Sequence, residues 1–157
     1  MSKIRSILLV CTGNSCRSVM AEGLFKKYLK EAGKEDIEVG SAGIMALEGF
    51  SPVGETIDTM NKEGVDVSGY RSRRITAKLI DKSDLILVME VIHKDFILRM
   101  SPAAEGKTRL LKKYGADDKH KYPEGDGVPD PMGRPLDFYK LSLAIIKEEA
   151  KRIVGLL

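Results

Sequence analysis

The sequence lacks tryptophan, long hydrophobic runs and more than two histidines or two cysteines. His93 and His120 have no metal-ligand spacing, so a metal centre is not expected, and both are predicted to lie at the surface. Two cysteines are too few for a disulfide framework, and in a reducing compartment they indicate reactivity or redox sensing. The apolar run from Ile7 to Val10 is too short for a signal peptide or a membrane span. We therefore expect a cytoplasmic protein without a membrane partner.

A large charge of one sign is also lacking, since 26 Lys and Arg stand against 23 Asp and Glu, for a net charge of +3. This balance does not favour a nucleic-acid partner, although it would not repel an anionic substrate. The arginines at positions 71, 73 and 74 are predicted to form a solvated edge. A length of 157 residues fits one domain, residues 1–157, which can bury a core without disulfides or metals.

The hydrophobic pattern alternates between strands and helices. Short apolar runs predict strands at residues 4–10, 37–42, 84–89 and 108–111. Helical spacing predicts helices that follow Ser18 and stop at Gly33, begin at Ser51-Pro52, begin at Thr76, run through 92–99, and run from Tyr139 to Leu157. Such alternation is typical of an α/β fold with right-handed βαβ units and a parallel sheet covered on both faces. Sites in these folds lie beyond the carboxyl ends of the strands, and Cys11 falls at the first of them.

Residues 11–18 (CTGNSCRS), which we call the cysteine loop, join the first strand to the first helix. A helix N-terminus has unpaired N–H groups and a partial positive charge, and both favour an anion and a thiolate at Cys11. Gly13 is expected to let the loop turn its amides towards one centre. Arg17 can grip two phosphate oxygens, and Ser18 can donate a hydrogen bond to the Cys11 sulfur. The pattern predicts a phosphate site with a cysteine nucleophile.

A second segment supplies a candidate acid. Residues 123–135, the proline loop, contain four of the six prolines and three glycines, so we expect an ordered surface loop. Asp130 in this loop is the candidate general acid for the leaving group. The alternative is that Asp130 only initiates a turn before its proline. Glu124, Asp126 and Asp137 are weaker rivals.

Three motifs in order resemble the low-molecular-weight protein tyrosine phosphatase family: V-C-T-G-N-S-C-R-S-x-M-A-E, the S-A-G that starts at Ser41, and the D-P that starts at Asp130. The resemblance covers nearly the whole chain. It implies a flavodoxin-like fold with a four-stranded parallel sheet, phosphorylated protein substrates, a cysteinyl-phosphate intermediate, and no metal or other cofactor. By the same resemblance, Cys11 is the nucleophile and Arg17 grips the phosphoryl group. The rest of the phosphate-binding loop comprises Thr12, Gly13, Asn14, Ser15, Cys16 and Ser18, with Asn14, Ser18 and Ser41 in a supporting hydrogen-bond network.

The sequence departs from the tyrosine-specific pattern at three positions. Val19 replaces the usual proline, which relaxes the start of the helix slightly. Ser15 replaces a bulky aliphatic residue, and Met132 replaces an aromatic residue that stacks on phosphotyrosine. Ser15 and the D-P-x-G-x-x-x-D-x-Y-K run look more like the bacterial protein arginine phosphatases of the same family, although that branch usually has Thr at the Ser15 position. Both substrates therefore stay open.

Two other functional classes and one local question also remain. The C-T-G-N-S-C-R-S and M-A-E-G runs are similar to thioredoxin-coupled arsenate reductases, but no cysteine follows Cys16 to continue their relay. A non-catalytic anion-binding module would not need the nucleophile. Cys16 either packs as a small hydrophobe or forms a reversible disulfide with Cys11 that protects the nucleophile.

Overall fold

A parallel β-sheet forms the centre of the protein, in a computed structural model that describes residues 3–116 and 125–157. Its strands, in the spatial order β2-β1-β3-β4, are β1 (Ser6–Cys11), β2 (Glu38–Gly43), β3 (Leu85–Val88) and β4 (Thr108–Leu110). All three pairings are parallel. Every residue of β3 is buried, as is β1 after its first residue, because apolar side chains point to both faces. The predicted α/β class and four-stranded parallel sheet are confirmed.

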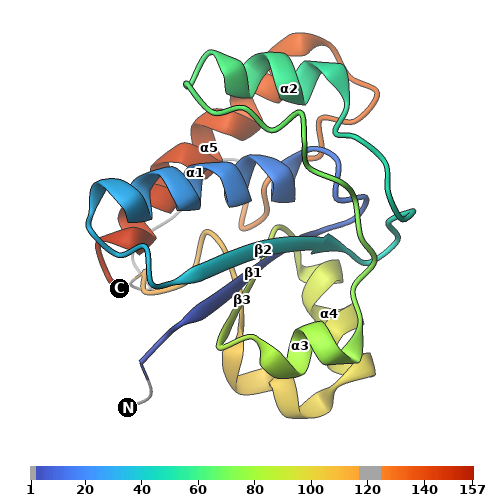
Figure 1. Ribbon diagram of the computed structural model, residues 1–157. Helices are drawn as coiled ribbons and strands as arrows, with labels where there is room; N and C mark the ends of the chain where they lie inside the picture. The colour runs from blue at the N-terminus through green and yellow to red at the C-terminus, as the bar shows by residue number, and fades with distance from the viewer. Residues whose placement is uncertain (1–2, 117–124) are drawn as a thin grey trace.

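Helices cover both faces of this sheet (Figure 1). One face carries α1 (Arg17–Glu31), α2 (Gly54–Asn61) and α5 (Leu136–Val154). The opposite face carries α3 (Ala77–Lys82) and α4 (Val91–Met100), and a short 3₁₀ helix, η1 (Pro102–Lys107), precedes β4. No helix in the described part of the chain combines the length and the apolarity needed to cross a membrane.

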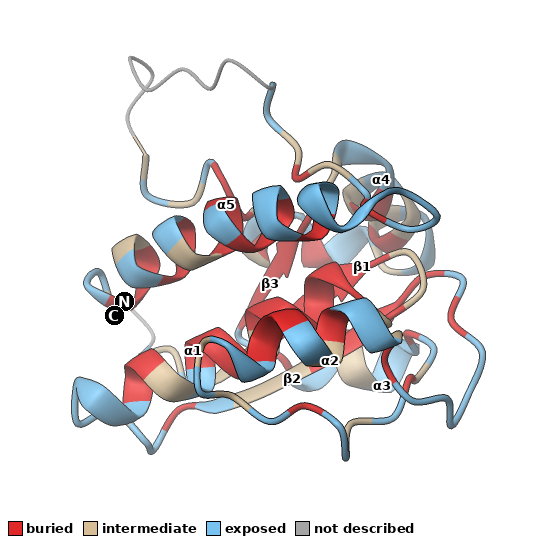
Figure 2. Ribbon diagram, turned by 90° about the horizontal axis from the view of Figure 1, so that it is seen from above, coloured by how far each residue is buried: buried red, intermediate tan, exposed pale blue. Residues whose placement is uncertain are grey.

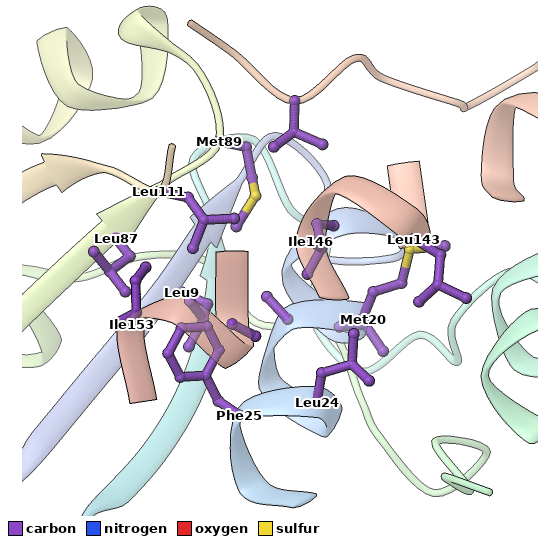
Figure 3. Close-up of a cluster of buried hydrophobic side chains, with 14 of the residues drawn as sticks. Leu9, Met20, Leu24, Phe25, Leu87, Met89, Leu111, Leu143, Ile146 and Ile153 are labelled. Carbon is purple, nitrogen blue, oxygen red and sulfur yellow. The ribbon is translucent and has the colours of Figure 1, made fainter. Parts of the chain in front are cut away.

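The larger of two hydrophobic clusters lies between the sheet and the α1–α5 pair. Figure 2 shows the buried sides of α1 and α5 turned towards the interior and their outer sides exposed. Figure 3 shows side chains from the strands meeting those of the two helices; the labelled ones include Leu9, Phe25, Leu87, Ile146 and Ile153. The smaller cluster fills the face under α3 and α4. Both faces of the sheet are therefore sealed.

Several predicted boundaries are confirmed, and one helix start is wrong. Gly33 follows α1 with a φ of 70°, and the Thr76 side chain caps α3 by accepting the Leu79 N–H. The second helix begins at Gly54 instead of Ser51-Pro52. Val53, the residue before the helix, is extended, and its N–H donates to the Ser15 carbonyl at 3.4 Å instead of joining a helical turn.

The predicted ends of the chain differ in smaller ways. The first strand begins at Ser6 rather than at residue 4. The buried stripe of the last helix ends at Val154, so Leu157 lies beyond the helix and is only half-buried. His120 and Glu124, on which two expectations rest, lie outside the described residues.

The strand order fixes where a site can form. β1 pairs with β2 on one side and with β3 on the other. The connection after β1 therefore leads to one edge of the sheet, and the connection after β2 returns to the opposite side of β1. A parallel sheet opens a crevice at such a switch point, beyond the carboxyl ends of its strands. Cys11 is the last residue of β1 and lies at this crevice.

Candidate active site

The cysteine loop leaves several main-chain donors without acceptors. It runs from the buried end of β1 to α1, whose N-cap is Cys16 and whose first N–H paired in the helical manner is that of Met20. Within the part of the chain that the structure describes, no main-chain N–H from Gly13 to Ser18 has a hydrogen-bond acceptor. Unpaired amides at a helix start form a site for an anion.

The loop turns at Asn14 rather than at Gly13. Asn14 has a φ of 53°, in the left-handed region that asparagine tolerates better than most residues. A Cβ at Gly13 would meet only the Ser15 hydroxyl, at an ordinary 3.5 Å, and Gly13 has no positive φ, so the backbone of the loop does not itself require this glycine. Its expected role in keeping the amides open to an anion stays a prediction. The glycine that the loop does require is Gly43 on β2, where a Cβ would lie 2.5 Å from the Thr12 carbonyl oxygen.

Hydrogen bonds fix the direction in which Ser18 donates. The Asn14 side-chain NH₂ gives its two protons to the Ser18 hydroxyl (2.8 Å) and the Ser41 hydroxyl (2.9 Å). Both hydroxyls therefore accept from Asn14 and place their own protons elsewhere. Ser18 then donates to the Cys11 sulfur, 3.0 Å away, so this sulfur is the acceptor of the hydrogen bond.

Charged side chains next to this network fix its position. Ser41 donates to Glu22 at 2.6 Å, and Lys26 pairs with the same carboxylate at 2.5 Å. The Arg73 main-chain N–H donates to Asn14 Oδ1 at 3.0 Å, which identifies this atom of the side-chain amide as the oxygen and the other as the NH₂ group. Arg73 also donates from Nε to the Ser41 carbonyl at 2.8 Å, so it is half-buried and not part of a solvated edge.

The Arg17 guanidinium is held rigidly although it is almost fully buried. Its side chain is 2% exposed, and Nη1 lies 2.5 Å from the Glu90 carboxylate and 2.9 Å from the Val128 carbonyl. Val128 in turn donates its main-chain N–H to the Met89 carbonyl, which ties the proline loop to the end of β3. A planar guanidinium fixed in this way is preorganised to bind two oxygens of a phosphoryl group.

Asp130 from the proline loop reaches the same place. Its Oδ2 lies 3.7 Å from Arg17 Nη2, and its side chain is 49% exposed. Its Oδ1 accepts the Met132 N–H at 3.0 Å, so Asp130 also forms the turn that the sequence suggested as its alternative role. The two roles are compatible. The rivals do not come as close: Asp126 pairs with Lys113, and Asp137 lies in the first turn of α5.

The surface position predicted for His93 is wrong. His93 is completely buried, and its Nε2 lies 2.9 Å from the Thr12 hydroxyl. Its Nδ1 accepts the main-chain N–H of Glu90 in a capping box at the start of α4. Burial, with a contribution from the charge of Arg17, lowers the pKa of His93 from 6.5 to about 4, against the opposite pull of Glu90 and Asp130. His93 is therefore neutral near pH 7.

This burial predicts a loss of stability in mild acid. The unfolded chain binds a proton at His93 near pH 6.5 and the folded chain only near pH 4, so unfolding is favoured as the pH falls between these values. The His93 contribution, on the order of 3 kcal/mol, should be present above pH 6.5 and lost by pH 4. Denaturant titrations at several pH values should show a smaller decline for His93→Gln than for the wild-type protein. Parallel declines would contradict the depressed pKa.

Cys16 lies in a different environment from Cys11. Burial raises the pKa of the Cys16 thiol, which favours the neutral thiol, and the residue packs into the larger hydrophobic cluster. Tyr139 of α5 is a buried neighbour whose own pKa burial raises to about 12. Both cysteines are free thiols. The packing role predicted for Cys16 is thus present, and a reversible disulfide with Cys11 stays a prediction.

An apolar rim flanks the cysteine loop. The Ile44 and Met45 N–H groups donate to the Cys11 and Thr12 carbonyls, which fixes the segment after β2 against the loop. This segment carries exposed apolar side chains, namely Met45, Leu47 and Phe50. Met132 of the proline loop is also exposed, and Ser15 is partly exposed on the cysteine loop. Segments next to the cysteine loop therefore expose apolar side chains as well as the small hydroxyl of Ser15.

Comparison with known proteins identifies the family. Residues 6–156 match the profile of the low molecular weight phosphotyrosine protein phosphatases. The chain belongs to this family. It is 32% identical over 155 residues to the low molecular weight protein-tyrosine-phosphatase Etp of Escherichia coli K12, covering 96% of each chain. It is 34% identical over 134 residues to the protein-arginine-phosphatase of Geobacillus stearothermophilus, covering 85% of this chain and 83% of the relative.

The fold is shared with a solved family member as well. A mutant of the YwlE arginine phosphatase with a phosphorylated active-site serine superposes with a TM-score of 0.87. It is 29% identical, and the match covers 97% of this chain and 95% of that one. The relatives are phosphoric monoester hydrolases, so the chain is grouped with protein phosphatases, and the comparisons do not indicate an arsenate reductase.

The structure adds residues that the sequence analysis missed. Glu90, which pairs with Arg17, directly follows β3 in the same way that the cysteine loop follows β1, so its position after a strand was a usable signal. Glu22 is the last residue of the first of the three motifs, but only the fold shows that it accepts a hydrogen bond from Ser41. Arg73 lies among other arginines, so its sequence position does not distinguish it. The described residues contain no cluster of three or more His, Cys, Asp or Glu side chains suited to a metal ion.

Proposed function

We propose that this protein hydrolyses phosphorylated protein side chains in the cytoplasm through a cysteinyl-phosphate intermediate, with phosphotyrosine as the substrate. Cys11 attacks the phosphorus while Arg17 and the loop amides hold the non-bridging oxygens. Asp130 gives a proton to the leaving oxygen and then takes one from the attacking water. The P–O bond of the ester is replaced by a P–S bond, and water finally releases inorganic phosphate and the Cys11 thiolate.

The observation that carries this proposal is the directed hydrogen bond from Ser18 to Cys11 beside a buried, immobilised Arg17. Ser18 stabilises the thiolate both as the attacking group and as the group that leaves when water attacks the intermediate. Arg17 is held by Glu90 and Val128 on one side only, which leaves Nη2 with weaker contacts to Thr12 and Asp130. The phosphorylated serine in the YwlE mutant supports a covalent step in this family.

A second substrate, phosphoarginine, is supported by a different observation. Ser15 leaves a small, partly exposed hydroxyl on the cysteine loop, where tyrosine-specific members place a bulky residue. The identity to the Geobacillus stearothermophilus protein-arginine-phosphatase, 34% over 134 residues, is similar to the 32% over 155 residues found for the tyrosine phosphatase Etp. The exposed apolar side chains of Met45, Leu47 and Phe50 favour the aromatic ring of phosphotyrosine instead.

Turnover of phosphotyrosine and phosphoarginine peptides by wild-type protein and Ser15→Ile tests both points. Isoleucine fills the space beside the loop and removes the hydroxyl, so the ratio of phosphotyrosine to phosphoarginine turnover should rise. The expected change corresponds to roughly 1 to 3 kcal/mol in relative transition-state binding and should come mainly from slower turnover of phosphoarginine. Ser68→Ile, on an exposed loop between α2 and α3, is the matched control. An unchanged ratio in Ser15→Ile would remove Ser15 from specificity, and no wild-type turnover of either peptide would reject the proposed function.

A further inference from the structure

The Thr12 hydroxyl, next to the nucleophile in sequence, receives two hydrogen bonds. His93 Nε2 lies 2.9 Å from Thr12 Oγ1, and Arg17 Nη2 lies 3.5 Å from the same oxygen. The direction of the His93 contact follows from the other ring nitrogen. Because Nδ1 accepts the main-chain N–H of Glu90, a neutral imidazole must carry its proton on Nε2 and donate it to Thr12.

The Thr12 proton is consequently directed away from both donors. An oxygen that accepts from His93 and Arg17 keeps one group to give, its own O–H. Among the described residues, no acceptor lies within hydrogen-bond distance of that hydroxyl. Thr12 is only half-buried, so the O–H is available to a molecule that enters beside Arg17.

We propose that Thr12, oriented by His93, donates a hydrogen bond to a non-bridging phosphoryl oxygen of the substrate. The inference rests on the proposed function, in which Arg17 holds those oxygens. Thr12 Oγ1 is close to Arg17 Nη2, so a phosphoryl oxygen bound to this nitrogen comes within reach of the threonine proton. Thr12 contacts the substrate, whereas His93 is a positioning residue that acts through Thr12. No proton is transferred, so the hydrogen bond changes only the stability of the bound group.

The energetic reason is the charge of the phosphoryl group. Its oxygens carry spreading negative charge in the transition state, and a donor that is already oriented need not reorganise. Without His93, the Thr12 hydroxyl could accept from Arg17 alone and rotate its proton to another direction. His93 is completely buried and is fixed by its hydrogen bond from the Glu90 backbone, so its own hydrogen bond to Thr12 holds the hydroxyl in one orientation. The groups that face His93 are Thr12, Arg17, Glu90 and Asp130.

The test measures turnover of an activated aryl phosphate and inhibition by inorganic phosphate. Thr12→Val, which removes the hydroxyl at constant shape, should lower kcat/KM by about 10- to 100-fold and weaken phosphate inhibition. Thr12→Ser should restore most of both. Thr108→Val is the matched control, because this buried hydroxyl on β4 donates to the Ala104 carbonyl and should affect stability only.

The role of His93 is tested in two backgrounds. His93→Leu should lower kcat/KM in the wild-type protein but have little further effect in Thr12→Val, and His93→Gln, which keeps a side-chain donor, should recover part of the loss. Equal losses in both backgrounds would show that His93 acts through the fold and not through Thr12. Near-normal turnover and phosphate inhibition in Thr12→Val would overturn the inference while leaving the proposed function intact, since that function is judged on wild-type turnover.

Discussion

Cys11→Ser should abolish turnover of an activated aryl phosphate, with a loss on the order of 10⁴-fold or more, while the protein stays folded. A serine hydroxyl is a much weaker nucleophile than a cysteine sulfur, and a phosphoryl group bound to serine oxygen leaves far less readily when water attacks, so turnover is lost. The other features of the site do not depend on sulfur. Arg17 is held by Glu90 and Val128, and Asn14 is held by Arg73.

The variant should therefore still bind the anion. Inorganic phosphate should protect Cys11→Ser against thermal unfolding about as well as it protects the wild-type protein. Cys16→Ser is the matched control, because Cys16 is equally buried but packs into the hydrophobic cluster, and it should lose far less activity. Substantial turnover by a folded Cys11→Ser protein would show that another group is the nucleophile.

The parts of the structure that the sequence predicts are those with a local physical cause. Apolar runs such as residues 84–89 are long enough for a buried strand and too short for a helix, and Thr76 and Gly33 have the chemistry of caps. The position of Cys11 at a strand end follows from the same pattern. The short run at residues 108–111 also predicts a strand, and the structure has one at Thr108–Leu110, although an isolated run of this length carries little information.

What the sequence does not predict depends on contacts between distant segments. His93 reads as a surface residue because a polar side chain on an amphipathic helix is normally exposed, yet it fills the space between α4 and the cysteine loop. Arg73 lies among charged residues, so its sequence position suggests exposure. Its guanidinium packs inwards over Gly40, because a Cβ at this position would lie 2.6 Å from Arg73 Nη2 and the glycine leaves that space open. The start of α2 differs from the prediction for the same reason, since the Val53 N–H forms a hydrogen bond with the cysteine loop.

The division of labour within the site follows from these contacts. Arg17 receives its geometry from β3 and the proline loop, whereas Cys11 receives its hydrogen bond through a network anchored on β2 and α1. The two halves meet at the cysteine loop, which carries both Cys11 and Arg17. Substitutions on the Glu22–Ser41 side should therefore act on the nucleophile, and substitutions on the Glu90 side should act on phosphate binding.

Asp130→Asn should slow hydrolysis of phenyl phosphate, a poor leaving group, by about 10² to 10⁴-fold, and that of nitrophenyl phosphate far less. An alkoxide or phenoxide of high basicity needs a proton as the P–O bond breaks, whereas an activated phenolate leaves without one. Asparagine has the shape of aspartate but no acidic proton. It also retains an oxygen for the Met132 N–H, so the turn of the proline loop should survive the substitution.

The comparison with other acids of the same loop region decides the assignment. Asp126→Asn is the matched control, because Asp126 pairs with Lys113 at 3.0 Å on the exposed surface and should show no dependence on the leaving group. Asp137→Asn, at the start of α5, should behave in the same way. If Asp130→Asn slows both substrates equally, the carboxylate acts only in the turn or on Arg17, 3.7 Å away, and the proton must come from another donor. A leaving-group dependence confined to Asp130→Asn would establish it as the general acid.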